Sequence, residues 1–219
     1  MTEYEQFIRA KNKRVSDVGF EAENLPSFLF PFQREIVKRA CVRGRSAIFA
    51  ECGLGKTGMQ LAWAEQVHRK TGGKILVLAP LAVSGQTVRE GEKFGIPLTY
   101  AKEQSEVRGA ITITNYERLK NFDTSQFVGV VLDESGILKA YSGTTKRAII
   151  EAFRETPYRL ACSATPAPND IQEIGNHAEF LSLMTSNEMI ARWFCTTFDA
   201  GKFRLKGHAV DIFWNWVNS

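Results

Sequence analysis

The chain has 219 residues, of which 44% are hydrophobic and 24% charged, and its formal net charge is +4. These values are typical of a soluble globular protein, and the length suggests one large domain or one and a half. The modest positive charge permits contact with nucleic acid but does not require it. No apolar run approaches the roughly 18 residues that a membrane span needs, and the N-terminus lacks the layout of a secretory signal. We therefore expect a cytoplasmic protein without a membrane partner.

The cysteines favour free thiols over a metal site. They lie far apart, without a C-x-x-C spacing, at Cys41, Cys52, Cys162 and Cys195. A zinc site is therefore not expected, and free thiols agree with a reducing cytoplasm.

The chain begins with a charged N-terminal extension, residues 1–31. Its basic cluster favours a solvated arm over a dedicated nucleic-acid contact. The cluster comprises Arg9, Lys11, Lys13 and Arg14. A helix is expected from Phe32, where apolar residues recur at helical spacing, and Gly44 ends it.

A glycine-rich segment follows and predicts a phosphate-binding loop. The apolar run 46–50 predicts a strand, and the pattern 59–70 predicts a helix. Between them lies a turn that ends in Gly55-Lys56-Thr57. Backbone N–H groups of such a turn, together with the helix N-terminus, bind phosphate, while the lysine reaches the terminal phosphates and the threonine binds Mg²⁺. The general pattern has a first glycine where this chain has Ala50.

The next part of the chain alternates strands with helices over short loops. Strands are expected at residues 74–79, 110–114, 127–132 and 158–162, and helices at 84–94, 116–119 and 144–153. The run 74–79 is continuously apolar, which is typical of a strand buried on both faces. The alternation predicts an α/β fold with a mainly parallel sheet sandwiched by helices.

The strand pattern disappears after Pro168. Residues 171–184 and 187–198 are predicted to be helical, and the segment 209–217 is an apolar helix rich in aromatic residues. Such a helix needs a surface to pack on. Either it folds back on the sheet, or the chain is a fragment of something longer, and we favour the fragment.

Two adjacent carboxylates follow the buried strand 127–132. Ligands of parallel sheets lie beyond the C-terminal ends of the strands, so Asp133 and Glu134 should emerge beside the phosphate-binding loop. Asp133 would hold Mg²⁺, and Glu134 would orient and deprotonate the attacking water. The alternative is an acidic helix start, which the helix dipole favours. The presence of a phosphate-binding loop upstream favours nucleotide hydrolysis.

Six short segments, in chain order, resemble the motifs of superfamily 2 helicases and translocases, most closely the Swi/Snf type of phage and bacterial origin. They are Phe32-Gln33, Gly53-Leu54-Gly55-Lys56-Thr57, Ala79-Pro80-Leu81 with Gln86, Thr114-Asn115-Tyr116-Glu117, Asp133-Glu134-Ser135-Gly136 and Ser163-Ala164-Thr165-Pro166. The family's phosphate-binding loop also lacks the first glycine. The resemblance implies that residues 32–170 form a first RecA-like P-loop lobe. Residues 171–219 would form a helical C-terminal extension, the start of an insertion that leads to a missing second lobe.

The resemblance also implies roles for individual residues. ATP would be bound by Gln33, Gly53, Leu54, Gly55, Lys56, Thr57 and Gly58. Mg²⁺ would be bound by Thr57 and Asp133. Hydrolysis would depend on Glu134, Lys56 and Asp133. Nucleic acid would contact Pro80, Gln86 and Asn115, and hydrolysis would be coupled to lobe movement by Ser163 and Thr165. Pro80 could instead be a strand-end breaker and Asn115 a helix cap. For Ser163 and Thr165 we expect a hydrogen bond to the neighbourhood of Glu134.

The favoured function is the ATP-binding lobe of a DNA-dependent ATPase, which would be either a helicase or a double-stranded DNA translocase. The protein is expected in the cytoplasm, or in the host cytoplasm if the chain is phage-encoded. Its partners would be double-stranded DNA and the second lobe, which supplies arginines worth on the order of 10³–10⁵ in rate. We therefore expect slow hydrolysis at most. The alternatives are a P-loop small-molecule kinase and a non-catalytic nucleotide-binding module. Lys146 is expected on a solvated face, and His177 is expected to be a packing residue.

Overall fold

A computed structural model of the chain describes residues 18–139, 144–196 and 203–219. The basic cluster at Arg9, Lys11, Lys13 and Arg14 lies outside these residues. The described part is built on a six-stranded, fully parallel sheet with the strand order β1-β6-β5-β2-β4-β3. In that order the strands are Arg45–Phe49, Tyr158–Ser163, Phe127–Leu132, Lys74–Ala79, Ile111–Asn115 and Thr99–Tyr100.

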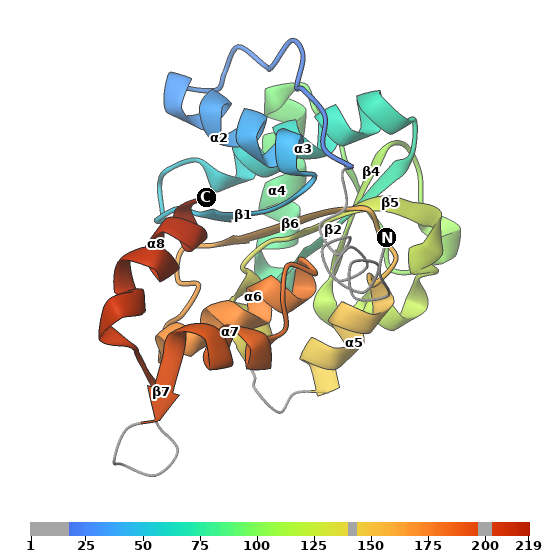
Figure 1. Cartoon of the computed structure of the whole chain (residues 1–219). Helices are drawn as coiled ribbons and strands as arrows, with labels where there is room; N and C mark the ends of the chain where they lie inside the picture. The colour runs from blue at the N-terminus through green and yellow to red at the C-terminus, as the bar shows by residue number, and fades with distance from the viewer. Residues whose placement is uncertain (1–17, 140–143, 197–202) are drawn as a thin grey trace, which may run out of the picture.

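Helices cover both faces of this sheet (Figure 1). One face carries α2 (Pro31–Arg43), α3 (Lys56–Thr71) and α4 (Leu81–Phe94), and the other carries α5 (Thr144–Ala152) and α6 (Ile174–Phe180). Each face has its own apolar cluster, and the central strand β2 contributes to both, through Ile75 and Val77 on one side and Leu76 and Leu78 on the other. The predicted α/β fold is confirmed.

The sequence prediction missed or misjudged short elements of the sheet layer. Strand β3 has two residues, too few for any periodicity to be recognised, and it pairs with β4. The predicted short helix at 116–119 is a 3₁₀ helix, Tyr116–Asn121. The predicted helix at 84–94 begins three residues earlier, at Leu81, because Pro80 serves as its N-cap.

The C-terminal extension contains helices, as predicted, and also a small antiparallel sheet. Helix α7 (Ser186–Trp193) ends before a hairpin of β7 (Phe194–Thr196) and β8 (Phe203–Leu205), which precedes α8 (Val210–Asn218). The predicted helix 187–198 is therefore wrong after Trp193, where aromatic and β-branched side chains favour a strand. The predicted helix 171–184 is also too long, because α6 ends at Phe180.

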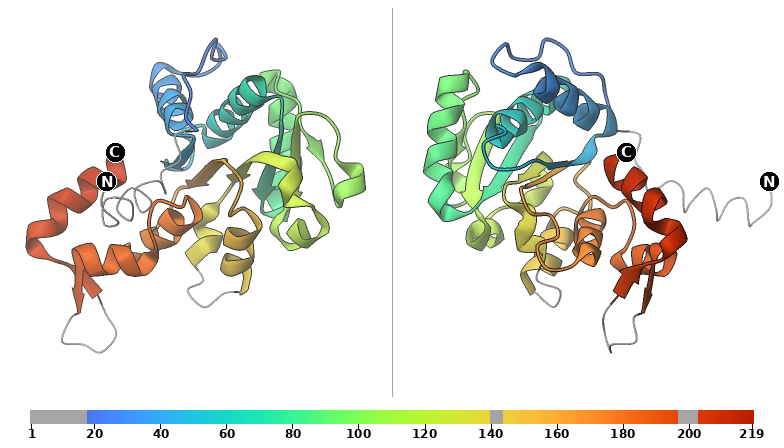
Figure 2. Two further views of the ribbon diagram at one scale, coloured as in Figure 1. Left: turned by 45° about the vertical axis from the view of Figure 1, so that its right-hand side comes forward. Right: turned by 90° about the vertical axis from the view of Figure 1, so that its left-hand side faces the viewer.

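The aromatic helix α8 packs within the extension. Phe213 is fully buried and makes edge contacts with Trp193 and Phe194, and Trp216 packs on Trp193. Both views of Figure 2 place α8 and the hairpin at the side of the sheet. The extension thus has an apolar cluster of its own, separate from the two clusters of the sheet. Among the described residues no helix combines the length and the apolar character that crossing a bilayer requires.

A buried arginine joins the sheet to the start of the extension. Arg159 of β6 is 1% exposed, and burial lowers the pKa of its guanidinium to about 10. Its Nη1 donates to the carbonyl of Phe180 at 2.6 Å and to the hydroxyl of Ser182 at 2.8 Å. Its Nε donates to the carbonyl of Thr156 at 2.8 Å, and Nη2 donates to the carbonyl of Arg154. Arg159 therefore satisfies the Phe180 carbonyl at the end of α6, which has no helical partner, and two carbonyls in the turn before β6.

Candidate nucleotide site

Most of the predicted site residues follow the C-terminal ends of parallel strands. The phosphate-loop segment follows β1, the Asp133-Glu134 pair follows β5, and the S-A-T segment follows β6. Backbone hydrogen bonds join these ends, from Ala50 N to the Ser163 carbonyl at 3.2 Å and from Asp133 N to the Leu78 carbonyl at 2.8 Å. The sheet therefore brings segments from distant parts of the sequence to one edge.

The loop before α3 has the backbone of a phosphate cradle. Gly55 has φ +75° and forms the N-cap of α3, a conformation that glycine adopts without strain. A Cβ at this position would lie 2.4 Å from Nε2 of Gln33, so a larger residue would also displace that side chain. Lys56 donates from Nζ to the carbonyls of Ala50 at 2.9 Å and Glu51 at 3.3 Å. Its ammonium group is thus held by the loop itself.

Gln33 of α2 is bound to the same loop. Its Nε2 donates to the carbonyl of Leu54 at 2.9 Å, and its Oε1 accepts from the backbone N–H of Phe30 at 2.9 Å. The side chain is buried, with a residue exposure of 6%. The amide that could read an adenine edge therefore already contacts the phosphate loop.

A cleft of about 470 Å³ opens at this edge of the sheet. It is lined by most of the residues predicted for ATP and Mg²⁺, namely Gln33, Gly53, Gly55, Lys56, Thr57, Gly58, Asp133 and Glu134. Leu54 does not line the cleft, although its carbonyl accepts the hydrogen bond from Gln33. Gln86, which was predicted to contact nucleic acid, does line the cleft. Phe28, Phe30 and Phe94 form an apolar wall of the same cleft. A cleft lined by both a polar phosphate loop and aromatic side chains suits a nucleotide with its phosphates and its base.

Asp133 is the most firmly held carboxylate of the site. Its Oδ1 accepts from Gln60 Nε2 at 2.7 Å and from the Glu134 backbone N–H at 3.1 Å, and its backbone carbonyl accepts from the Tyr116 hydroxyl at 2.7 Å. Burial raises the pKa of Asp133, while the bonds from Gln60 and Glu134 and the charge of Lys56 act in the opposite direction. Such a carboxylate, near the hydroxyl-bearing Thr57, fits a hard cation such as Mg²⁺, which prefers oxygen ligands.

Glu134 differs from its neighbours on both sides. Asp133 and Ser135 are buried, whereas Glu134 is exposed and lines the cleft. Its φ is +51°, which is uncommon for a residue with a side chain. The loop thus turns one carboxylate outward between two buried side chains.

The other predicted residues lie away from the cleft. Pro80 follows β2 directly, and Asn115 is the last residue of the neighbouring strand β4. Asn115 is buried, and its Oδ1 has no hydrogen-bond partner among the described residues. The Ser163 hydroxyl accepts a local bond from the Thr165 backbone N–H at 3.0 Å. The structure gives no direct bond from Ser163 to Glu134 within its described part, but a Cβ on Gly136 would lie 3.8 Å from Ser163 Oγ. The two segments therefore lie next to one another.

Two residues that hold Asp133 were missed by sequence reasoning. Gln60 lies one turn after Lys56 within a buried, otherwise mostly apolar run of α3, and this break in the apolar pattern was the signal. Tyr116 belongs to a segment that we interpreted only as a nucleic-acid contact, and its sequence gives no sign of a bond to Asp133.

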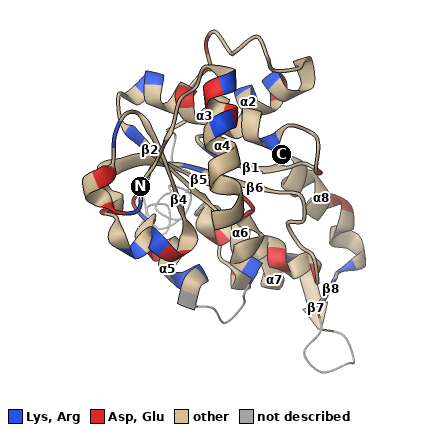
Figure 3. Cartoon of the chain, turned by 180° about the vertical axis from the view of Figure 1, so that it is seen from behind, with Lys and Arg blue, Asp and Glu red and all other residues tan. Residues whose placement is uncertain are grey.

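Charges of both signs are mixed on the side of the molecule that Figure 3 shows. In Figure 3, Lys and Arg residues are interspersed with Asp and Glu residues over the helices of both layers.

Comparison with solved structures supports the fold. The chain resembles the SWI2/SNF2 ATPase core domain of Sulfolobus solfataricus, with a TM-score of 0.65, 22% identity, and coverage of 80% of this chain and 39% of that one. The same ATPase core in complex with double-stranded DNA matches with a TM-score of 0.62, 20% identity, and coverage of 82% and 41%. The UvsW helicase of bacteriophage T4 matches with a TM-score of 0.60, 14% identity, and coverage of 81% and 66%. The chain thus spans less than two-thirds of each of these proteins, and the fold is RecA-like.

Comparison with curated protein sequences gave no match. A family model, that of DEAD/DEAH box helicases, matches residues 30–174, which include all six motifs. The predicted relationship to superfamily 2 helicases and translocases is confirmed, and the chain belongs to the DEAD/DEAH box helicase family.

Proposed function

We propose that this chain is the ATP-binding lobe of a DNA-dependent ATPase, a helicase or a double-stranded DNA translocase. The observation that carries the proposal is the convergence of Lys56, Thr57, Asp133 and Glu134 on one cleft, which Gln33 also lines. Family membership argues against a small-molecule kinase.

The residues of the cleft divide the work of binding and hydrolysis. Lys56 would exchange its two backbone carbonyl partners for phosphate oxygens, and the N–H groups at the start of α3 would bind the same phosphates. Gln33 would read the adenine edge. Glu134, exposed and aimed into the cleft, would orient the attacking water and accept its proton. Thr57 and Asp133 would hold Mg²⁺, which offsets the charge of the phosphates when bound.

The proposed partners are a second RecA-like lobe and double-stranded DNA. The Sulfolobus relative was solved with double-stranded DNA. Pro80, Gln86 and Asn115 are proposed to contact nucleic acid, and Ser163 and Thr165 to couple hydrolysis to lobe movement. Without the arginines of a second lobe, which are worth on the order of 10³–10⁵ in rate, hydrolysis by this chain would be slow.

Replacing Lys56 with alanine is expected to weaken binding of a fluorescent ATP analogue in the presence of Mg²⁺ by about ten- to a hundredfold, because a charge-assisted hydrogen bond to phosphate is lost. Equilibrium titration monitored by fluorescence anisotropy measures this change. The control is Lys70→Ala, which removes the same charge from the exposed end of the same helix and should leave affinity unchanged. Equal affinities for the two variants, or no binding by the unmodified chain, would contradict the proposal.

A second measurement addresses the DNA partner. The unmodified chain is expected to bind double-stranded DNA without sequence preference, and to lose affinity steeply as salt rises, because contacts to phosphates release counterions. Anisotropy titrations of labelled duplexes at several salt concentrations, with double-stranded RNA for comparison, measure this. Salt-independent binding, or a preference for RNA, would exclude the DNA assignment.

A further inference from the structure

A buried hydrogen bond lies outside the cleft and involves Ser135, the residue that follows Glu134. The Ser135 hydroxyl and His177 Nε2 are 3.0 Å apart, although 42 residues separate them in the sequence. Both residues are almost fully buried, with exposures of 0% and 2%. His177 belongs to α6, the first helix after the S-A-T segment. The contact therefore joins the loop that carries Glu134 to the beginning of the extension.

The surroundings of His177 keep its ring neutral. Burial lowers the pKa of His177 to about 4, and the backbone and carboxylate of Glu173 oppose this only in part. Phe49 at the end of β1 packs against the ring with a centroid distance of 5.2 Å and an interplanar angle of 83°. A neutral imidazole has one donor and one acceptor nitrogen, so the bond to a rotatable hydroxyl forms in either tautomer.

The loop that this bond reaches needs support. Glu134 has φ +51°, in the left-handed region, which is strained for a residue with a side chain. On its N-terminal side, Asp133 is fixed by Gln60 and Tyr116. On its C-terminal side, the next side chain, Ser135, is the one that His177 holds. Glu134 is thus the single exposed residue between two anchored ones.

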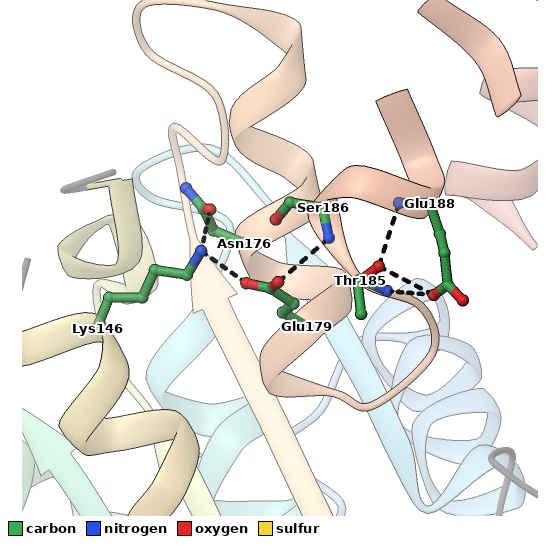
Figure 4. Close-up of polar contacts among 6 residues, drawn as sticks. All are labelled: Lys146, Asn176, Glu179, Thr185, Ser186 and Glu188. Carbon is green, nitrogen blue, oxygen red and sulfur yellow. Dashed lines mark hydrogen bonds and ion pairs between the residues drawn. The ribbon is translucent and has the colours of Figure 1, made fainter. Parts of the chain in front are cut away.

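Helix α6 is itself fixed, which gives the His177 ring a defined place. Lys146 of α5 donates from Nζ to Asn176 Oδ1 at 2.7 Å and pairs with Glu179 Oε2 at 2.6 Å (Figure 4). Glu179 in turn accepts from the backbone N–H of Ser186 in α7 at 3.3 Å. The expectation that Lys146 faces solvent is wrong, since its side chain is buried between these helices. The network holds α6 against α5 and α7, with His177 pointing to the loop.

We propose that His177 is a positioning residue for hydrolysis, because its hydrogen bond to Ser135 keeps the loop in the conformation that presents Glu134 to the cleft. The extension then forms part of the hydrolytic machinery. This inference rests on the proposed function, since it assigns a supporting role to the same ATP site.

Three variants test the bond. His177→Leu removes it while keeping apolar bulk, Ser135→Ala removes it from the other side, and His177→Gln keeps a polar group near the position of Nε2. We expect the single-turnover rate of ATP hydrolysis to fall about five- to tenfold in the first two and to be largely retained in the third, with ATP affinity unchanged. The double variant, Ser135→Ala with His177→Leu, should be no slower than either single variant, because both remove one interaction.

The control is His68→Leu, which removes an imidazole that bonds the Gly73 carbonyl at 2.8 Å, far from the cleft. It should lower thermal stability without changing the hydrolysis rate. The inference is overturned if His177→Leu hydrolyses ATP at the unmodified rate, if its effects and those of Ser135→Ala simply add, or if His177→Gln is as slow as His177→Leu.

A readout without nucleotide separates this inference from the proposed function. The chain has three histidines, so nitrogen-15 NMR of the imidazoles can assign His177 as the ring that is absent in His177→Leu. We expect its Nε2 resonance to shift in Ser135→Ala while the other rings do not change. An unshifted resonance overturns the bond itself. Failure of the unmodified chain to bind ATP refutes the proposed function, and the bond is then judged from these spectra alone.

Discussion

Replacing Glu134 with glutamine is expected to lower the single-turnover rate of ATP hydrolysis by about 10²- to 10⁴-fold, the usual contribution of a general base. Glutamine has the same shape but cannot accept the proton of the attacking water. ATP affinity should stay within about twofold, because Lys56 and the start of α3 make the phosphate contacts. Rapid mixing of excess protein with labelled ATP, followed by quench and product separation, gives the rate.

The matched control for this substitution is Glu90→Gln. Glu90 also lines the cleft and accepts a hydrogen bond from Gln86 at 2.8 Å, so its substitution removes the same charge from the same cavity. Its hydrolysis rate should remain close to that of the unmodified chain. If both variants were slowed equally, the general electrostatics of the cleft would explain the loss, and Glu134 would not be the base.

Replacing Arg159 with leucine is expected to lower the free energy of unfolding by about 3–5 kcal/mol, because several buried carbonyls lose their donor at a cost of about 1–3 kcal/mol each. The substitution leaves buried carbonyls without donors, at the end of α6 and in the turn before β6. Small proteins are stable by only about 5–15 kcal/mol, so the loss is a large fraction of the total. Chemical denaturation followed by circular dichroism measures it.

Two further variants provide comparison values for this loss of stability. Arg154→Leu removes an exposed arginine whose ion pair with Glu151 lies in solvent, and it should cost less than about 1 kcal/mol. Arg159→Lys keeps the charge but not the planar array of donors, so its cost should lie between the two. Equal midpoints for Arg159→Leu and Arg154→Leu would show that the buried guanidinium does not stabilise the chain.

The sequence was sufficient where a structure depends on adjacent residues. The loop from Gly53 to Thr57, the strands of continuous apolar residues and the carboxylates after β5 each carry their signal within a few positions. The parallel sheet then brings these segments to one edge, since the C-terminal ends of its strands meet there. For this reason the convergence of Lys56 and Glu134 could be expected from their positions alone.

The sequence was insufficient where a contact joins distant residues or an element is very short. The hydrogen bond between Gln60 and Asp133 joins residues 73 positions apart, and the bond between His177 and Ser135 joins residues 42 positions apart. Hydrophobic periodicity predicts local elements and carries no information on such pairings. Lys146 shows the same difficulty, because charge predicts exposure unless a buried partner is known. The strands β7 and β8 have three residues each, which is shorter than any pattern that separates a strand from a helix.

The carbonyl groups that hold Lys56 have a thermodynamic consequence. A lysine side chain free in solvent loses about 2 kcal/mol of rotamer freedom when it is fixed by a ligand. Here the ammonium group is already fixed between Ala50 and Glu51. Much of that entropy is therefore lost when the chain folds. Binding of an anion then costs less side-chain entropy, because the lysine is already ordered.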